Sequence, residues 1–154
     1  MLISMKSKYA LKALTALAEA RDRGALQIAE LASSEKIPKK FLEAILLVLR
    51  NQGVLSSKKG PGGGYSLAVA PASLTIGKIV RAFEGDLAPV PCLGDTSAAK
   101  CTECADMGTC GTRLVMADVK SAVSSVLDRT TLADMIERSD IERRKSLKLL
   151  DYAI

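Results

Sequence analysis

The chain has no histidine and no tryptophan, and only 3% of its residues are aromatic. Without histidine, the zinc sites that combine cysteine with imidazole ligands are excluded. A core must be built from aliphatic side chains, and the 48% hydrophobic content supplies them. The chain also lacks any apolar run near the roughly 20 residues of a membrane span. Lysines interrupt the N-terminal stretch, and no small-residue cleavage site follows it, so a signal peptide is not expected. We expect a cytoplasmic protein with no membrane partner.

Positive charge is concentrated in the first half of the chain. The formal net charge is +5, but residues 1–65 hold eleven Lys and Arg against five Asp and Glu, whereas residues 66–154 hold eleven against twelve. A basic region of this kind is typical of proteins that bind a polyanion, above all nucleic acid. Short domains also carry positive charge without such a role, so charge alone does not decide the function.

The first 86 residues show three helical patterns, a hairpin pattern and a fourth helical pattern. This order is typical of a winged helix-turn-helix, in which the second and third helices form the turn motif and the hairpin forms the wing. The expected elements are a helix capped by Ser7 and ending before Gly24, a helix over about 28–34, a helix from Pro38 to the cap at Gly53, strands over 54–57 and 65–69, and a helix between Thr75 and Gly85.

The second half is expected to hold a loop and a long helix. Residues 87–111 have little periodicity, and a long amphipathic helix is predicted over 112–128. Thr131 is expected to cap a short helix, with Asp134 at the capping-box spacing. We therefore predict a mainly α fold with a small β-hairpin wing, divided into a winged helix-turn-helix domain (1–86), a cysteine loop (87–111), a long helix with a short following helix (112–138) and a tail that is helical or loose (139–154).

The stretch KKGPGGGYSLAVAP, residues 58–71, is interpreted as the tip of the wing. A phosphate-binding P-loop would run from a strand through glycines to Lys and then into a helix, whereas here the lysines come first and a strand follows. Glycines permit positive φ and bring backbone N–H groups close to a phosphate. Tyr65 can pack the wing onto the helices, and the alternative is a flexible surface loop. The wing residues predicted to meet DNA are Lys58, Lys59, Gly60, Gly62, Gly63 and Tyr65.

The third helix is predicted to be the recognition helix. Lys39 and Lys40 lie at its N-terminal end, which is the end that enters the major groove. Glu43 lies one turn further, where a carboxylate can accept a hydrogen bond from cytosine N4, and Arg50 lies near the end of the helix. Each of these charges can also be a solvated surface residue.

Four cysteines lie within 19 residues in the pattern C-x8-C-x2-C-x5-C: Cys92, Cys101, Cys104 and Cys110. In a reducing compartment, such a cluster more often indicates metal or redox chemistry than structural disulfides. A zinc ribbon usually has two CxxC pairs, and this chain has one. Soft thiolates on an irregular loop suit an iron–sulfur cluster. Zinc, free thiols and a redox disulfide remain the alternatives.

Several motifs together resemble the Rrf2 (IscR/NsrR/RirA) family of bacterial winged-helix transcription regulators. They are SKYALKAL at the start, PKKFLEAILLVLRNQGVLSSKKGPGGGYSLA in the middle, TIGKIVRAFEG after it, and the cysteine loop with its following long helix. The resemblance covers about residues 1–137. It implies a bacterial homodimer that binds double-stranded promoter DNA and takes no small-molecule substrate. The long helix would be the dimerisation helix, with Val115, Val119, Ala122 and Val126 along one line.

The resemblance also implies a 2Fe–2S or 4Fe–4S cluster on the cysteine loop, whose state would control DNA affinity. Family members commonly use three cysteines, which match Cys92, Cys104 and Cys110. The fourth ligands of two subfamilies do not carry over, because Arg113 stands where one has histidine and Lys8 where another has aspartate. Cys101 is the replacement that an all-thiolate site would use, and we prefer 4Fe–4S. The other possibility is a three-cysteine site with one labile iron.

The resemblance therefore implies a repressor that senses iron, redox stress or nitric oxide. A cluster-free regulator that senses oxidants through its thiols is the principal alternative. An oxidoreductase that uses CTEC as a redox pair is disfavoured, because the chain has no histidine, no cofactor fingerprint after a strand and no thioredoxin-like order of elements. A protein-binding adaptor would not need the positive charge of the first half.

Overall fold

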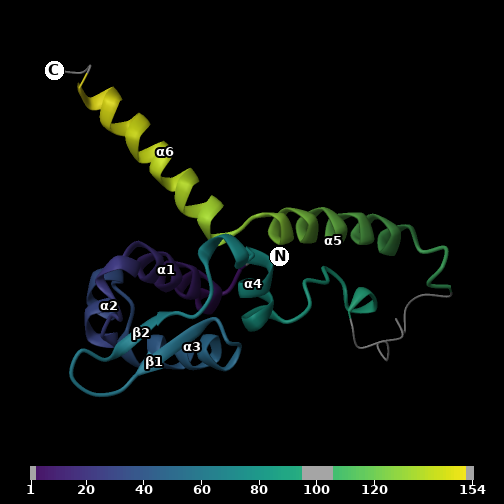
Figure 1. The fold of residues 1–154 in the computed structure, drawn as a ribbon. Coiled ribbons are helices and arrows are strands. Elements are labelled where there is room, and N and C mark those ends of the chain that lie inside the picture. Colours follow the sequence, from purple (N-terminus) through teal and green to yellow (C-terminus); the bar gives the residue numbers. More distant parts are fainter. Residues whose placement is uncertain (1–2, 95–105, 152–154) are drawn as a thin grey trace.

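The computed structural model describes residues 3–94 and 106–151, with side chains as far as Leu147. A winged-helix domain occupies the first half, and two long helices leave it in different directions (Figure 1). The helices are α1 (Met5–Glu19), α2 (Ile28–Glu35), α3 (Lys39–Asn51), α4 (Ile76–Glu84), α5 (Gly111–Arg129) and α6 (Leu132–Asp151), the strands are β1 (Leu55–Lys58) and β2 (Gly64–Leu67), and short 3-10 turns are η1 (Arg21–Arg23), η2 (Pro71–Ser73) and η3 (Pro91–Leu93).

The core is aliphatic, as the composition predicts. Leu14 of α1, Leu46 of α3 and Ile79 of α4 are fully buried in one cluster, which the wing side extends with Val54 and Leu55. Burial of each such side chain contributes about 2 kcal/mol. The few rings lie at its margin, where Tyr9 and Phe41 make an edge-to-face contact with their centroids 5.6 Å apart. The predicted winged helix-turn-helix is confirmed.

The start of α1 differs from the prediction. Ser4, not Ser7, is the N-cap, and its hydroxyl accepts a hydrogen bond from the Ser7 amide at 3.3 Å. Ser7 lies inside the helix, is fully buried, and donates its hydroxyl to the carboxylate of Glu84 at the end of α4. Ser4 also donates to this carboxylate from its amide at 3.0 Å and its hydroxyl at 2.6 Å. Serine is a common N-cap residue, but Ser7 instead donates a hydrogen bond to Glu84, which lies 77 residues away in the sequence.

Most other helix ends follow their local signals. Thr75 caps α4 by accepting from the Lys78 amide, and Gly85 ends that helix with φ +70°. Pro38 is the N-cap of α3 rather than its first helical residue, and Gly53 follows the helix end with φ +70°. Both strands lie within two residues of their predicted starts.

The junction between α5 and α6 is anchored to the winged-helix domain. The amide of Ile76 donates to the carbonyl of Thr130, and the amide of Leu132 donates to the carbonyl of Leu74, each at 2.8 Å. Leu132 is fully buried, so the first turn of α6 belongs to the core. Thr131 and Asp134 form the predicted capping box, in which the Asp134 amide donates to the Thr131 hydroxyl and the Asp134 carboxylate accepts from the Thr131 amide.

The helix after this junction is longer than predicted. The sequence predicts a short helix followed by a tail that is helical or loose, and α6 runs without a break to Asp151, so the tail is helical as far as that residue. The segment contains no glycine or proline, and ion pairs one turn apart, Arg143–Asp140 and Lys145–Glu142, support its exposed part. Within the described residues, no helix has both the length and the apolar character needed to cross a membrane.

Candidate nucleic-acid interface and cysteine segment

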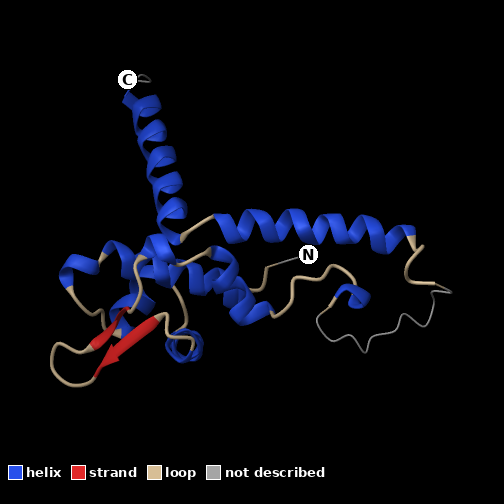
Figure 2. Ribbon diagram, turned by 45° about the vertical axis from the view of Figure 1, so that its right-hand side comes forward, coloured by secondary structure: helices blue, strands red, loops and turns tan. Residues whose placement is uncertain are grey.

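The wing is a two-stranded hairpin (Figure 2). A third backbone segment, at Leu26, ties it to the helical domain. β1 and β2 pair antiparallel, with Ser57 opposite Tyr65. Tyr65 also exchanges two backbone hydrogen bonds with Leu26, at 2.8 and 2.9 Å. A Cβ on Gly64 would lie 2.2 Å from the Leu26 carbonyl oxygen, and Gly64 has φ +147°. Only glycine therefore allows this close approach of the two backbones.

The tip of the wing presents its lysines to solvent. Lys58, Lys59, Gly60 and Gly62 are exposed. Gly63 is buried instead, and its amide donates to the Gly60 carbonyl at 2.9 Å. Tyr65 is partly buried and packs against the core. The sequence analysis assigned all of these residues to the DNA-binding surface. The amides of Gly63 and Tyr65, however, are used in hydrogen bonds within the protein that stabilise the wing.

The predicted polar residues of α3 all lie on its outer face. Lys39, Lys40, Glu43 and Arg50 are exposed, while Leu42, Ile45, Leu46 and Leu49 are buried on the opposite side. The solvent-exposed faces of α3 and the wing thus carry basic side chains, and backbone hydrogen bonds to Leu26 hold the wing in place. Such a surface can bind phosphate and reach base edges.

α5 exposes an apolar line. Val115, Val119 and Val126 are 57%, 42% and 56% exposed, and Ala122 on the same line is exposed too. No residue of α5 is fully buried within the described part of the chain. Leu127, on another side of the helix, packs against the core. An exposed apolar line of this length is typical of a helix that packs on a partner.

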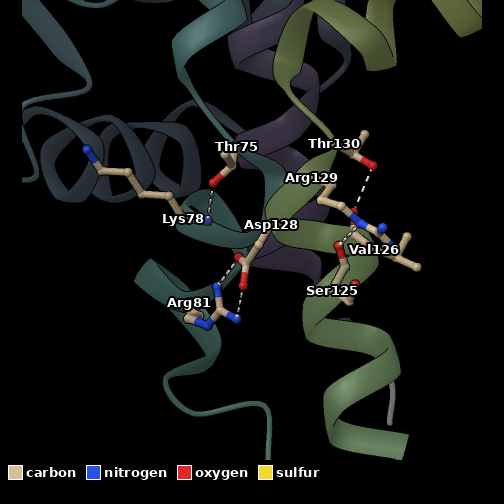
Figure 3. Close-up of polar contacts among 8 residues, drawn as sticks. All are labelled: Thr75, Lys78, Arg81, Ser125, Val126, Asp128, Arg129 and Thr130. Carbon is tan, nitrogen blue, oxygen red and sulfur yellow. Dashed lines mark hydrogen bonds and ion pairs between the residues drawn. The ribbon is translucent and has the colours of Figure 1, made fainter.

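A bidentate ion pair fixes the end of α5 to α4 (Figure 3). Arg81 Nη1 and Nη2 donate to the two carboxylate oxygens of Asp128, at 2.5 and 2.9 Å. These hydrogen bonds hold the pKa of the Asp128 carboxyl below its ordinary value. Gly77 makes room for the pair, because a Cβ there would lie 2.0 Å from Asp128 Oδ1. The sequence analysis missed this contact, whose partners are 47 residues apart.

The cysteine segment, residues 92–110, connects the winged-helix domain to α5. Cys92 lies in η3 and Cys110 is the N-cap of α5, and both are partly exposed. Cys101 and Cys104 lie outside the described residues. Just before Cys110, Asp106 accepts hydrogen bonds from the Gly108 amide and the Thr109 hydroxyl, each at 2.9 Å. These bonds lower the pKa of the Asp106 carboxyl and form a turn that leads into the helix.

The chemistry of the donor set fits an iron–sulfur cluster. Within residues 3–94 and 106–151, no three acidic or cysteine side chains gather as a metal site, so a complete site would need the cysteines at 101 and 104. Four thiols without any histidine suit iron–sulfur ligation better than a hard cation. Arg113, in the first turn of α5, has a buried Nε with no hydrogen-bond partner among the described residues. Such an N–H group can donate a hydrogen bond to an anionic, thiolate-ligated group.

The comparisons with known proteins decide the family. The Rrf2 family, described as "Iron-dependent Transcriptional regulator", matches residues 3–138. The chain belongs to the Rrf2 family. An rrf2-like regulator of Rhodobacter capsulatus is 44% identical over 138 residues, which are 88% of this chain and 92% of that protein.

Two solved structures relate this Rrf2 chain to different members of the family. The structure of CymR, the global cysteine regulator of B. subtilis, matches with a TM-score of 0.74 and 30% identity, over 90% of this chain and 98% of that chain. T. potens IscR matches with a TM-score of 0.72 and 29% identity, over 90% and 88%. The chain is thus a transcriptional regulator with a winged-helix fold, and the family is one of regulators, not enzymes.

Proposed function

We propose that this Rrf2 protein is a homodimeric repressor whose affinity for promoter DNA is controlled by an iron–sulfur cluster on Cys92, Cys101, Cys104 and Cys110. The observation that carries the proposal is the position of the cysteine segment. It begins just after the winged-helix domain and ends at the N-cap of α5, whose exposed face would meet the second subunit. A change in this segment would therefore act on the link between the DNA-binding domain and the dimer interface.

The chain's own residues supply the steps of binding. Lys39 and Lys40 would approach the major groove at the start of α3, while Lys58 and Lys59 would meet phosphates beside it. Glu43, on the same outer face of α3, would accept a hydrogen bond from a base edge such as cytosine N4. The bonds between Tyr65 and Leu26 would hold the wing to the segment that leads into α2. Two copies joined through α5 would present two recognition helices to half-sites one or more helical turns apart.

The cysteines would hold the cluster, which supplies a redox-active and chemically labile crosslink. Four thiolates are compatible with either cluster type, and we favour 4Fe–4S. In this proposal Arg113 does not ligate, because a guanidinium stays protonated in proteins. Cys101 would be the fourth ligand.

The first experiment is anaerobic purification followed by UV–visible and circular dichroism spectra, with iron and sulfide assays. A broad brown absorbance with both elements present supports 4Fe–4S, and structured bands at longer wavelength support 2Fe–2S. Selection from a pool of random DNA duplexes, with and without the cluster, then tests regulation. A protein that enriches no sequence in either form would overturn the proposal. Cys101→Ala should change the spectrum or the oxygen stability, and an unchanged protein would remove Cys101 from the ligand set.

A thiol sensor without a cluster is the second candidate. The likeness to CymR favours this candidate. The B. subtilis protein is described as the global cysteine regulator, and the structure of Staphylococcus aureus CymR has been solved in an oxidized form. A colourless, iron-free protein that still selects DNA, and loses that DNA on mild oxidation, would establish this candidate over the first.

A further inference from the structure

Lys120 of α5 makes a clamp between three parts of the chain. Its Nζ is 2.8 Å from Asp86 Oδ1 and 3.0 Å from Asp86 Oδ2, and it donates to the carbonyl of Leu93 at 2.7 Å. The side chains of Lys120 and Asp86 are only 26% and 21% exposed. An ammonium held between a carboxylate and a carbonyl in a half-buried position is more strongly bound than a surface pair.

One arm of the clamp holds the residue beside the first cysteine. Leu93 directly follows Cys92, and both lie in η3. Within η3 the amide of Leu93 donates to Val90 and that of Gly94 to Pro91, at 3.1 and 3.0 Å. A single 3-10 turn of three residues has little stability of its own. The bond from Lys120 therefore secures the turn that carries Cys92 against α5.

The other arm reaches the DNA-binding domain. Asp86 lies two residues after the end of α4, where Gly85 turns the chain with φ +70°. Glu84, the last residue of α4, accepts the hydroxyls of Ser4 and Ser7 at the start of α1. Lys120 thus joins the Cys92 turn to the end of α4, where Glu84 is in turn bonded to the start of α1.

We propose that Lys120 is a positioning residue for the η3 turn that carries Cys92. It holds Cys92 in place relative to α5 before any group binds, and it links that position to the end of α4. This inference rests on the proposed function in one respect only, namely that the group held by the cysteines is an iron–sulfur cluster. It assigns Lys120 no ligand role.

The direct test is hydrogen exchange on the full-length, reduced, metal-free protein. Lys120→Met should speed exchange of the Leu93 and Gly94 amides by about tenfold, because a charge-assisted hydrogen bond is lost. Amides in the middle of α3 should be unaffected. Lys120→Arg keeps a cation and donors, and should restore slow exchange. Lys78→Met is the matched control, because the side chain of Lys78 is exposed and bonds to no described residue.

A second readout separates positioning from a general loss of structure. In the anaerobically made protein, Lys120→Met should release iron to a chelator several-fold faster than Lys120→Arg or Lys78→Met, at unchanged thermal stability of the winged domain. Equal exchange at Leu93 and Gly94 in Lys120→Met and the wild type would overturn the inference. An iron-free wild-type protein would instead count against the proposed cluster, while the exchange comparison would still decide the role of Lys120.

Discussion

Single glycines decide how the wing is attached. Gly64 combines φ +147° with a backbone approach that leaves no room for a Cβ, since the Leu26 carbonyl oxygen would lie 2.2 Å from it. Gly62 also has positive φ, +70°, but nothing lies within 4 Å of its Cβ position. Substituting Gly62 therefore tests the cost of positive φ alone, whereas substituting Gly64 tests positive φ together with a steric clash.

Gly64→Ala should lower the free energy of unfolding by about 3 kcal/mol, because backbone strain and overpacking add. Gly62→Ala should cost about 1 kcal/mol, from strain alone. Urea unfolding monitored by circular dichroism measures both. Equal losses in the two variants would show that the Leu26 contact adds nothing to the stability of the wing.

Glu84 is the other residue whose role depends on distant partners. Hydrogen bonds from Ser4 and then Ser7 hold the pKa of the Glu84 carboxyl below its ordinary value. A carboxyl with a lowered folded-state pKa stabilises the protein above its unfolded pKa, and this contribution is lost as pH falls through the folded pKa.

Glu84→Gln should therefore lower the free energy of unfolding by about 1 kcal/mol near pH 7. The difference from the wild type should shrink as pH falls below the ordinary pKa of a glutamate and through the lowered pKa of Glu84 in the folded protein. Urea titrations at several pH values measure this. Glu43→Gln is the control, because the side chain of Glu43 is exposed and bonds to no described residue. A pH-independent difference would contradict the role assigned to the charge.

At the scale of elements, α5 has two unlike faces. One is tied to the domain through Arg81–Asp128 and Lys120–Asp86. The other exposes Val115, Val119 and Val126. Because burying each valine contributes about 1.5 kcal/mol or more, a symmetric pair of such faces supports the proposed dimer.

Val119→Asp should convert the proposed dimer to a monomer, because two carboxylates would be buried at the interface. Ser121→Asp places the same charge on α5 away from the apolar line, and should leave the dimer intact. Sedimentation equilibrium measures the mass of each variant. A wild-type protein that is monomeric at micromolar concentration, or a Val119→Asp dimer, would exclude this face as the interface.

At the scale of the whole molecule, the excess of positive over negative charge lies on the winged-helix domain. The excess of Lys and Arg in residues 1–65 reaches the surface on α3 and the wing, where Lys39, Lys40, Lys58 and Lys59 are exposed. Each lysine that neutralises a phosphate releases counterions from the DNA, so affinity should fall steeply with salt.

In the proposed dimer, Lys59→Ala would remove two such contacts. The slope of log affinity against log salt should become less negative by about 2. Fluorescence anisotropy with a selected duplex over a salt series measures the slope. Lys145→Ala in α6 is the control and should leave the slope unchanged. An unaltered slope for Lys59→Ala would remove the wing tip from the phosphate-binding surface.

The sequence by itself determined the order of elements, the aliphatic core, the caps at Thr75 and Thr131 and the outward faces of Lys39, Lys40 and Glu43. These features depend on neighbours within one or two turns, so periodicity and cap chemistry are sufficient to predict them. Tertiary structure alone decided that Ser7 is a buried donor, that Gly64 and Gly77 make room for distant groups, and that Lys120 joins Cys92's turn to α4. Those roles depend on partners tens of residues away, and local patterns carry no information about which distant atoms folding brings into contact.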